Sequence, residues 1–403
     1  MREMFEILLS TQSNTFATLY LPAAPCAIQD AMSKLQLDEG EVPVWDLMDR
    51  VGFEELSDCI DHQGNPLGMN VLTQKLTEMD SRQRTAFAAL LSMEPGMGAE
   101  SIPLSRLVDL AYSAETCEVI DALNDSQLGR HYAENGAVPN VKDLPAGVFD
   151  LLDFEHIGRS IRKQENGIFI GRTMEHPGGY VVQRQGQRQI YQDLDLTPKE
   201  PDYVVLLELS KGYFNDPDYD SETTIRLKLP AAEGTVDAVL TELDAAGWDE
   251  VGWTCLDCRV PLLVELITDE ENPDTILTLA QKLDSMPADQ LAMYKALVEV
   301  VDCASLDSAL DLIDDLPQYS LSPQLRVPTD AAKAYLSQFL PQKELEYIEP
   351  YLNWHELGDA LQEDRCVTLT EYGLLERKDV QPVLFEPSQE ESQRGGMNFA
   401  QGL

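Results

Sequence analysis

Positive charge is scarce in this sequence of 403 residues. Lys and Arg together number 29 against 71 Asp and Glu, so the formal net charge at pH 7 is −42. A protein that binds nucleic acid directly needs a cationic surface that displaces counterions from the phosphates. Anionic membranes attract basic segments for the same reason. The charge therefore argues against direct nucleic-acid binding and against binding to a membrane surface.

Long apolar runs are also missing. No stretch reaches the roughly 18 apolar residues that a membrane-spanning helix needs. The opening segment MREMFEILLSTQSN has only a short apolar run, which acids interrupt, and it does not fit a secretory signal. The seven cysteines are odd in number and widely spread, which favours reduced thiols over a disulfide framework. We expect a cytoplasmic protein.

Catalytic and metal-binding motifs are absent as well. The CxxC motif at Cys255 and Cys258 has no second pair at a zinc spacing. The acidic run 216–220 lacks the glycine and the final acid of a calcium loop. The five histidines form no HExxH motif, and GxSxG, GxGxxG and P-loop motifs do not occur. The sequence thus predicts no catalytic, metal or cofactor site, and an enzyme is the most remote alternative.

What the sequence does contain is a repeat. Its hydrophobic fraction of 43% suits a folded core, and its length suits two or more domains. Four segments recur in the same order, separated by 200 to 208 residues. The matching pairs are 19–24 with 227–232, 49–56 with 249–256, 70–79 with 277–286, and 151–161 with 351–361. Four matches in one order predict two copies of a unit of about 175 residues.

The repeat divides the chain into four parts. We expect a first copy over 1–183, a linker over 184–202, a second copy over 203–377 and a disordered tail over 378–403. The linker is assigned from its Gln, Arg, Asp and Pro content, and the tail from its polar, glycine-containing end.

Both copies share one internal plan. Alternating apolar residues at the start of each copy predict short strands, followed by an amphipathic helix, a helical middle and a closing helix with strands. The expected helices are 27–35, 67–91, 105–110, 115–123 and 153–163, and then 235–245, 274–301, 306–316, 330–339 and 354–362. The fold class is therefore α+β: two tandem copies of a unit with small β-sheets flanking a helical middle.

The acidic excess is unequal between the copies. Residues 1–200 carry a net charge of −15, and residues 201–403 carry −27. In the expected helix 306–316, Asp307, Asp311 and Asp314 share one face, although like charges four residues apart cost about 0.2–0.5 kcal/mol per pair. Solvated helix faces or adaptation to high salt would also place acids there. However, a net charge of about 2–8 is enough to keep a small domain soluble.

We therefore expect an acidic functional surface, with the second copy as its stronger half. In the first copy, four acids are expected along one side of the helix 115–123 and just beyond it. The expected surface residues are Glu115, Glu118, Asp121, Asp125, Asp269, Glu270, Glu271, Asp274, Asp307, Asp311, Asp314, Asp315, Glu344, Glu346, Glu349, Glu363 and Asp364.

The plan of each copy resembles the ArdA-type antirestriction proteins. The resemblance lies in the acidic helical middles around LTQKLTEMD and LAQKLDSMP, and in the closing pattern LLDFEHIGRSI and YLNWHELGDAL followed by strand. The resemblance implies an elongated three-part α+β unit that typically dimerises. It also implies a non-enzymatic DNA mimic, which occupies the DNA-binding cleft of type I restriction-modification enzymes and protects mobile DNA. The tandem copies would then form an intrachain pseudo-dimer, with a homodimer as the alternative.

Two other partner classes fit the same charge. One is a different basic, DNA-binding defence protein, and the other is a basic protein bound by an acidic adaptor. Mimicry predicts that duplex DNA competes with this protein for its partner and that binding weakens steeply with salt, because carboxylates would fill phosphate sites in a cationic groove. An adaptor need not show that competition.

Overall fold

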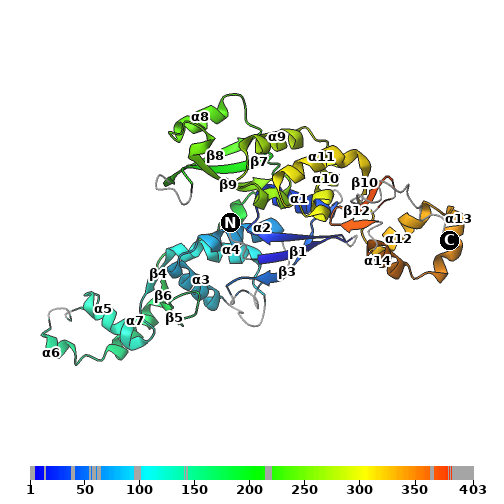
Figure 1. The fold of residues 1–403 in the computed structure, drawn as a ribbon. Helices are drawn as coiled ribbons and strands as arrows, with labels where there is room; N and C mark the ends of the chain where they lie inside the picture. The colour runs from blue at the N-terminus through cyan, green and yellow to red at the C-terminus, as the bar shows by residue number, and fades with distance from the viewer. Residues whose placement is uncertain are drawn as a thin grey trace. The chain divides into compact units, whose positions relative to one another are not determined.

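The structure is a computed structural model of a mixed α+β protein (Figure 1). It describes residues 5–12, 15–37, 41–53, 56, 60, 65–94, 101–139, 141, 144–213, 220–363, 367–379, 381 and 383. Within these residues the strands form four three-stranded antiparallel sheets and the rest is largely helical, so the expected α+β class is confirmed. None of the helices in this part of the chain has the length and apolar character that crossing a bilayer requires.

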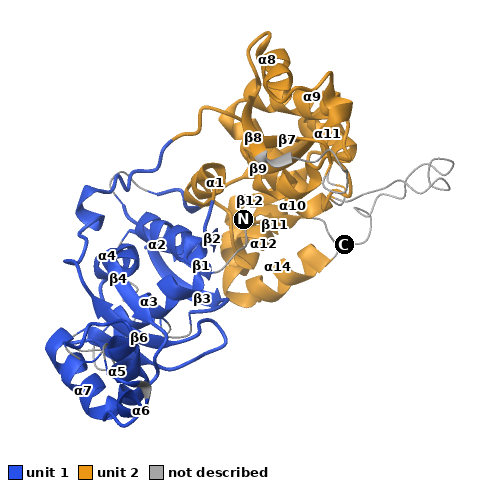
Figure 2. Cartoon of the chain, turned by 90° about the vertical axis from the view of Figure 1, so that its left-hand side faces the viewer, with its two compact units in different colours: residues 1–23, 35–199 blue, residues 24–34, 200–403 orange. Residues whose placement is uncertain are grey.

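The chain forms two compact units (Figure 2). Unit 1 contains residues 1–23 and 35–199, and unit 2 contains residues 24–34 and 200–403. Each unit has a sheet, a helical middle and a second sheet with its own helices. The short segment 24–34 belongs to the first copy by sequence but to unit 2 by its contacts.

Unit 1 begins with a sheet in the order β2-β1-β3, made of β1 (Phe5–Ser10), β2 (Phe16–Leu21) and β3 (Val44–Arg50). Apolar residues alternate along β1, so Phe5, Ile7 and Leu9 are buried. The middle contains α2 (Pro66–Glu78), α3 (Ser81–Met93) and α4 (Leu104–Ser113). The second sheet, in the order β4-β6-β5, contains β4 (Cys117–Ile120), β5 (Ile168–Ile170) and β6 (Gly179–Gln183). Between β4 and β5 lie α5 (Asp125–Glu134), α6 (Ala146–Phe149) and α7 (Phe154–Glu165).

Unit 2 follows the same plan and also receives α1 (Pro25–Leu35), except for the last residue of that helix. Its first sheet, in the order β8-β7-β9, contains β7 (Val205–Lys211), β8 (Asp220–Leu229) and β9 (Val251–Cys258), and α8 (Thr235–Glu242) follows β8. The middle contains α9 (Pro273–Asp284), α10 (Ala288–Val301) and α11 (Leu306–Asp315). The second sheet, in the order β10-β12-β11, contains β10 (Tyr319–Ser322), β11 (Thr368–Thr370) and β12 (Gly373–Arg377). Between β10 and β11 lie α12 (Pro328–Ser337), α13 (Gln342–Ile348) and α14 (Trp354–Glu363).

The two units therefore repeat one topology. In both, the first sheet has the first strand in its centre, and the second sheet has the last strand in its centre. The asparagines Asn65 and Asn272 each cap a helix that begins with proline, α2 and α9, by accepting a backbone N–H two residues ahead. The peptide bonds before Pro22 and Pro230 are both cis.

One of the four sequence matches is wrong. Trp45 pairs with Leu9 in unit 1, and Trp253 pairs with Leu209 in unit 2, so the two tryptophans are equivalent. The match of residues 49–56 with 249–256, which placed Phe53 over Trp253, is therefore out of register. Short apolar stretches with a glycine recur in many strands and turns, so such a match carries little information about register.

Two long expected helices are each broken in the middle. The helix 67–91 is α2 followed by α3, because the side chain of Asp80 caps α3 by accepting the N–H groups of Arg82 and Gln83. The helix 274–301 is likewise α9 followed by α10, with Pro287 immediately before α10. Asp80 and Pro287 thus each stand at the start of a second helix, where the apolar pattern alone predicted one continuous helix.

Glycines set the helix crossings in the last part of each unit. A Cβ atom on Gly158 of α7 would lie 1.8 Å from the carbonyl oxygen of Asp125, and one on Gly129 of α5 would lie 1.9 Å from that of Phe154. In unit 2, a Cβ on Gly358 of α14 would lie 1.9 Å from the carbonyl oxygen of Pro328 at the start of α12. The shared glycine of the closing sequence pattern therefore allows two helix backbones to touch.

Candidate functional site

The acidic excess is concentrated in the helical middle of unit 2. Residues 268–318 contain 12 Asp and Glu against 2 Lys, a net charge of −10. The equivalent residues 65–116 of unit 1 contain 6 acids against 4 bases, a net charge of −2. The two middles share a fold but differ in charge, so the fold itself does not require the acids.

Helices α9 and α11 lie side by side in this region. The Thr275 hydroxyl donates to Asp307 Oδ1 at 3.3 Å, and Lys282 Nζ lies 3.1 Å from Asp314 Oδ1. Each contact joins residues 32 positions apart. The helices therefore run in the same direction, and their acids line one surface. We call Asp274, Asp307, Asp311, Asp314 and Asp315 the α9/α11 acidic face; all five are exposed.

The spacing on α11 is comparable with the charge spacing of DNA. Asp307, Asp311 and Asp314 are separated by about 6 and about 4.5 Å along the helix axis, at about 1.5 Å per residue. A DNA strand carries one phosphate per about 3.4 Å of axis. On the opposite side of the helix, Leu306 and Ala309 are fully buried, so core packing fixes which way the acids point.

Little positive charge balances the acidic face. Of the two lysines within residues 268–318, Lys282 is paired with Asp314, and Lys295 is buried against Asp30. The neighbouring residues Asp269, Glu270 and Glu271 lead directly into α9. Within the described residues, Asp311 and Asp274 have no ion-pair partner, so their charge is directed at solvent.

The equivalent face of unit 1 is covered by the chain itself. Residues 184–199, expected to be a linker, belong to unit 1. Asp109, which matches Asp311 along the helix, accepts hydrogen bonds from the N–H groups of Ile190 and Tyr191 at 2.7 and 2.9 Å. The Tyr191 ring lies against Gly68 of α2. The face that displays acids in unit 2 therefore serves an internal contact in unit 1.

The expected helix 115–123 is wrong, and with it the arrangement of four acids in unit 1. Glu115 lies in a short 3-10 helix, Glu118 lies in β4, and Asp125 begins α5. Val119 and Ile120 pair with Val181 and Tyr180 of β6, and this pairing outweighs the apparent helical spacing of the acids.

Three of those four acids are paired with bases. Glu115 contacts Lys75 and Arg188, and these hydrogen bonds and charges lower the pKa of the Glu115 carboxyl. Glu118 lies 2.8 Å from Arg184. Asp125 accepts two hydrogen bonds from Arg162, which lower the pKa of its carboxyl. Asp121 is exposed. Most of this part of the expected surface is thus neutralised inside the unit.

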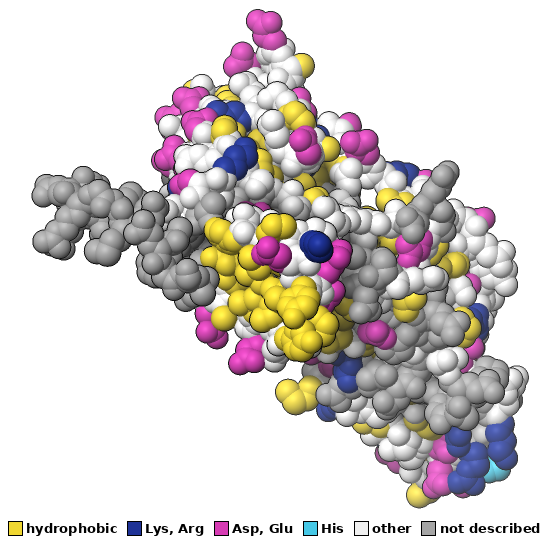
Figure 3. All heavy atoms as spheres, turned by 90° about the vertical axis from the view of Figure 1, so that its right-hand side faces the viewer, with side chains coloured by type: hydrophobic (Ala, Val, Ile, Leu, Met, Phe, Trp, Pro, Cys, Tyr) yellow, Lys and Arg dark blue, Asp and Glu magenta, His cyan; other side chains and the backbone are white. Residues whose placement is uncertain are grey.

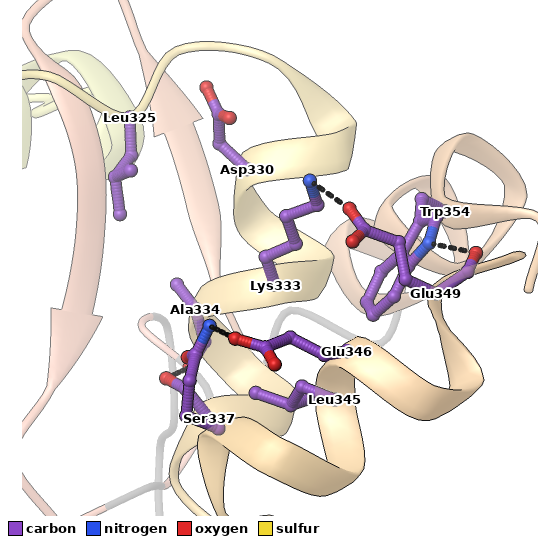
Figure 4. A pocket seen from close by; sticks show the side chains of 10 residues that line it. Leu325, Asp330, Lys333, Ala334, Ser337, Leu345, Glu346, Glu349 and Trp354 are labelled. Carbon is purple, nitrogen blue, oxygen red and sulfur yellow. Dashed lines mark hydrogen bonds and ion pairs between the residues drawn. The ribbon is translucent and has the colours of Figure 1, made fainter.

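Two of the expected acids in the last part of unit 2, Glu346 and Glu349, line a cavity of about 320 Å³ between α12, α13 and α14 (Figure 4). Glu349 pairs with Lys333 at 2.8 Å, and its carbonyl oxygen accepts the indole N–H of Trp354. Glu346 accepts a hydrogen bond from Gln342 at 3.4 Å. Glu344 and Glu363 are exposed, and Asp364 lies outside the described residues. The polar groups that line this cavity are engaged in ion pairs or hydrogen bonds with nearby groups, and they form no catalytic arrangement.

The CxxC motif is buried in β9. Cys255 and Cys258 are both thiols, and burial raises the pKa of each. Across the described part of the chain, no group of three or more His, Cys, Asp or Glu side chains is placed to hold a metal ion. The calcium-loop-like run 216–220 falls almost entirely outside the described residues.

Sequence reasoning missed a buried ionic cluster at α1. Asp30, only 3% exposed, accepts from Lys295 Nζ at 2.6 Å, from the Tyr372 hydroxyl at 2.9 Å and from Lys34 Nζ at 3.0 Å. Lys34 also pairs with Glu371 at 2.6 Å. Two features of the sequence could have indicated this cluster. Asp30 falls on the inner side of an amphipathic helix, and Lys295 lies in the middle of an apolar helix. The cluster joins α1 to α10 and to the start of β12.

Glu299 of α10 lies at the edge of this cluster. Its Oε1 accepts the Glu371 backbone N–H at 3.3 Å, and its Oε2 is buried with no hydrogen-bond partner in the described structure. Burial raises the pKa of the Glu299 carboxyl to about 7, and the charges of Glu371 and Asp30 act in the same direction, against Lys34. In the folded protein the carboxyl therefore stays protonated up to a higher pH than in the unfolded chain.

This arrangement predicts a pH dependence of stability. The folded protein binds more protons than the unfolded chain between the ordinary Glu pKa, near 4.5, and about 7. The free energy of unfolding should therefore fall by about 2 kcal/mol as the pH rises through that window, allowing for partial solvent screening. Glu299→Gln should remove this fall, which urea unfolding at pH 5 and pH 7.5 would measure. An unchanged difference between the two pH values in the variant would contradict the assignment.

The comparisons with known proteins add no relative. The chain matches no family model, and it matches no curated protein. The candidate site therefore depends on the geometry and charge of the chain alone. Its centre is the α9/α11 acidic face, because these acids are both exposed and poorly balanced.

Proposed function

We propose that this protein is a DNA mimic that inhibits type I restriction-modification enzymes by occupying their DNA-binding cleft, and that it acts in the cytoplasm to protect mobile DNA. The observation that carries the proposal is the α9/α11 acidic face. Its carboxylates stand at intervals comparable with phosphates, on a helix whose other side is fixed in the core. The resemblance of each copy to ArdA-type antirestriction proteins supports the same function.

The physical basis is competition for a cationic groove. A DNA-binding cleft holds Lys and Arg side chains at positions that suit phosphates, and binding releases the counterions of whatever polyanion enters. Because packing of Leu306 and Ala309 already fixes the helix that carries these carboxylates, little backbone entropy is lost when they enter such a cleft. A net charge of −42 also draws a basic partner by long-range attraction and speeds association.

The contrast between the two units supports this reading over simple solubility. Acids added for solubility would be spread over both middles, yet the net charges are −10 and −2. In unit 1, residues 184–199 cover the equivalent helix face and bases neutralise most of the acids nearby. We infer that unit 2 makes the principal contact with the target.

A competition experiment tests the function. A purified type I restriction-modification enzyme is immobilised, the protein is bound to it, and duplex DNA is added in increasing amounts. Mimicry predicts displacement by DNA, and inhibition of DNA cleavage at the same protein concentrations. Binding that duplex DNA does not displace would favour an acidic adaptor instead.

Neutralising the acidic face should weaken binding in a charge-dependent manner. The triple variant Asp307→Asn, Asp311→Asn, Asp315→Asn should lose about 10- to 100-fold in affinity, since exposed ion pairs are each worth up to about 1 kcal/mol. The slope of log K against log salt should fall by about 3, if each carboxylate replaces one phosphate contact. Titrations at several salt concentrations measure both quantities.

The matched control removes three exposed acids elsewhere in unit 2. Glu233→Gln, Asp237→Asn and Glu242→Gln also remove three negative charges, two from α8 and one from the residues just before it. This control should bind with nearly wild-type affinity. If both triple variants lost the same affinity, total charge would be responsible and the α9/α11 face would have no special role.

A further inference from the structure

Large aromatic side chains are exposed on the last part of unit 2. Tyr351 is 80% exposed, Tyr347 is 76% exposed, and Phe339 is 55% exposed. Together they form what we call the aromatic patch. Figure 3 shows hydrophobic side chains gathered on the face of the molecule that carries α12, α13 and α14. Exposed apolar side chains gathered on one face often mark an interaction site.

The patch is built on helices rather than on a loose segment. Tyr347 lies on α13 and faces Tyr351 with ring centroids 6.4 Å apart, and Phe339 packs on Tyr335 of α12 at 5.1 Å. On the same helix, Leu345 is 8% exposed, and the indole N–H of Trp354 donates to the carbonyl oxygen of Glu349, directly after α13. The backbone that carries the two tyrosines is therefore ordered before any partner binds, which limits the entropy lost on binding.

The aromatic patch is specific to the second copy. Counting back from the equivalent glycines Gly158 and Gly358, Tyr347 corresponds to Gly147 and Tyr351 corresponds to Leu151. The shared fold thus works with a glycine or a leucine at these positions. The tyrosines are not needed to pack α13 and α14.

The surroundings of the patch favour a basic partner. Glu344, Glu346 and Glu356 are exposed beside it, on α13 and at the start of α14. A second copy of this chain would bring the same acids, and a further net charge of −42, against them. A basic protein would place cations on the acidic rim while an apolar surface covers the rings.

We propose that the aromatic patch is a docking surface for the same basic, DNA-binding protein that the α9/α11 acidic face engages, and that it supplies an apolar anchor. This inference rests on the proposed function. Acids alone would attract every cationic groove, whereas tyrosines that become buried on binding require a complementary surface on the partner. The anchor therefore gives the mimic selectivity for one target and a part of the affinity that salt does not screen.

The test combines tyrosine substitutions with salt titration, using the full chain and a purified type I restriction-modification enzyme. The double variant Tyr347→Ala, Tyr351→Ala should bind about 30-fold more weakly or worse, as expected for buried aromatic anchors. Its slope of log K against log salt should equal that of the wild-type protein, because no charge is removed. The α11 triple Asn variant should show the opposite pattern, with a reduced slope.

A matched control lies in the first copy. Leu151, which is 84% exposed and equivalent to Tyr351, should be replaceable by Ala with less than a twofold change in affinity. Melting curves of all variants should coincide, because the substituted side chains are exposed.

Three results would overturn the inference. Wild-type affinity of the tyrosine variant, in a protein that still binds and is displaced by DNA, would reject the patch and leave the proposed function standing. Concentration-dependent self-association that the tyrosine substitutions abolish would assign the patch to a second copy. Failure of the wild-type chain to bind the enzyme at any salt concentration would reject both proposals.

Discussion

Gly158→Ala is expected to destabilise unit 1 by about 3 kcal/mol or more. The added Cβ would lie 1.8 Å from the carbonyl oxygen of Asp125, and 2.9 Å from the backbone nitrogen of Gly129. Both neighbours are backbone atoms of α5, so no side-chain rotation can relieve the overlap. The helices must separate, and the contacts of α5 with α7 are lost over their whole length. Thermal or urea unfolding followed by far-ultraviolet circular dichroism would measure the loss.

The control for this prediction is Gly147→Ala, in α6 of the same unit. A Cβ there would meet nothing within 4 Å. Alanine also restricts the unfolded chain more than glycine does, so this variant should be neutral or up to about 1 kcal/mol more stable. Gly358→Ala should repeat the large effect in unit 2, where the Cβ would lie 1.9 Å from the carbonyl oxygen of Pro328. Equal melting curves for Gly158→Ala and Gly147→Ala would show that α5 and α7 do not cross at these glycines.

Asp30→Asn is expected to cost about 3–5 kcal/mol of stability in unit 2. The substitution leaves Lys295, only 6% exposed, without its carboxylate partner at 2.6 Å. An unpaired buried ammonium has to be desolvated without compensation, and this explains the large expected cost. The Tyr372 hydroxyl loses its charged acceptor in the same step. Urea unfolding of the full chain would measure the change.

A double-mutant cycle separates the ion pair from the packing of α1. Asp30→Asn with Lys295→Met removes both charges, so the double variant should regain much of the stability that Asp30→Asn loses. The exposed pair of Lys199 and Asp195, 2.9 Å apart, provides the comparison, and Asp195→Asn should change stability by less than about 0.5 kcal/mol. A small loss for Asp30→Asn, equal to that at Asp195, would mean that water reaches the α1 cluster.

Much of the fold could be predicted from the sequence because the sequence contains two copies of one unit. Three of the four matched segments are equivalent in the structure, from the strands ending at Leu21 and Leu229 to the helices that contain Gly158 and Gly358. Periodicity also found most helices and the α+β class. Periodicity did not predict where one helix ends and the next begins, as at Asp80. Helix capping depends on local hydrogen bonds rather than on the apolar pattern.

The candidate site was only partly predictable. The acids of α9 and α11 could be placed on helix faces from their spacing, because Leu306 and Ala309 fix the buried side. Glu115, Glu118 and Asp125 could not, because strand pairing between β4 and β6 overrode their helical spacing. The aromatic patch also required the structure, since the sequence does not show that Tyr347 and Tyr351 are 76% and 80% exposed rather than packed in the core.

The sequence by itself determined the net charge of −42, its excess in the second half and the existence of two copies. These are properties of composition and order, and folding cannot change them. Only the tertiary structure decided which acids remain uncompensated. Asp125 and Glu118 meet arginines, Asp30 is buried against Lys295, and Asp109 binds the backbone of residues 190–191, whereas Asp311 faces solvent. The reason is that the pairing of an acid with a base depends on contacts between residues far apart in sequence. A count of charges along the chain gives no information about those contacts.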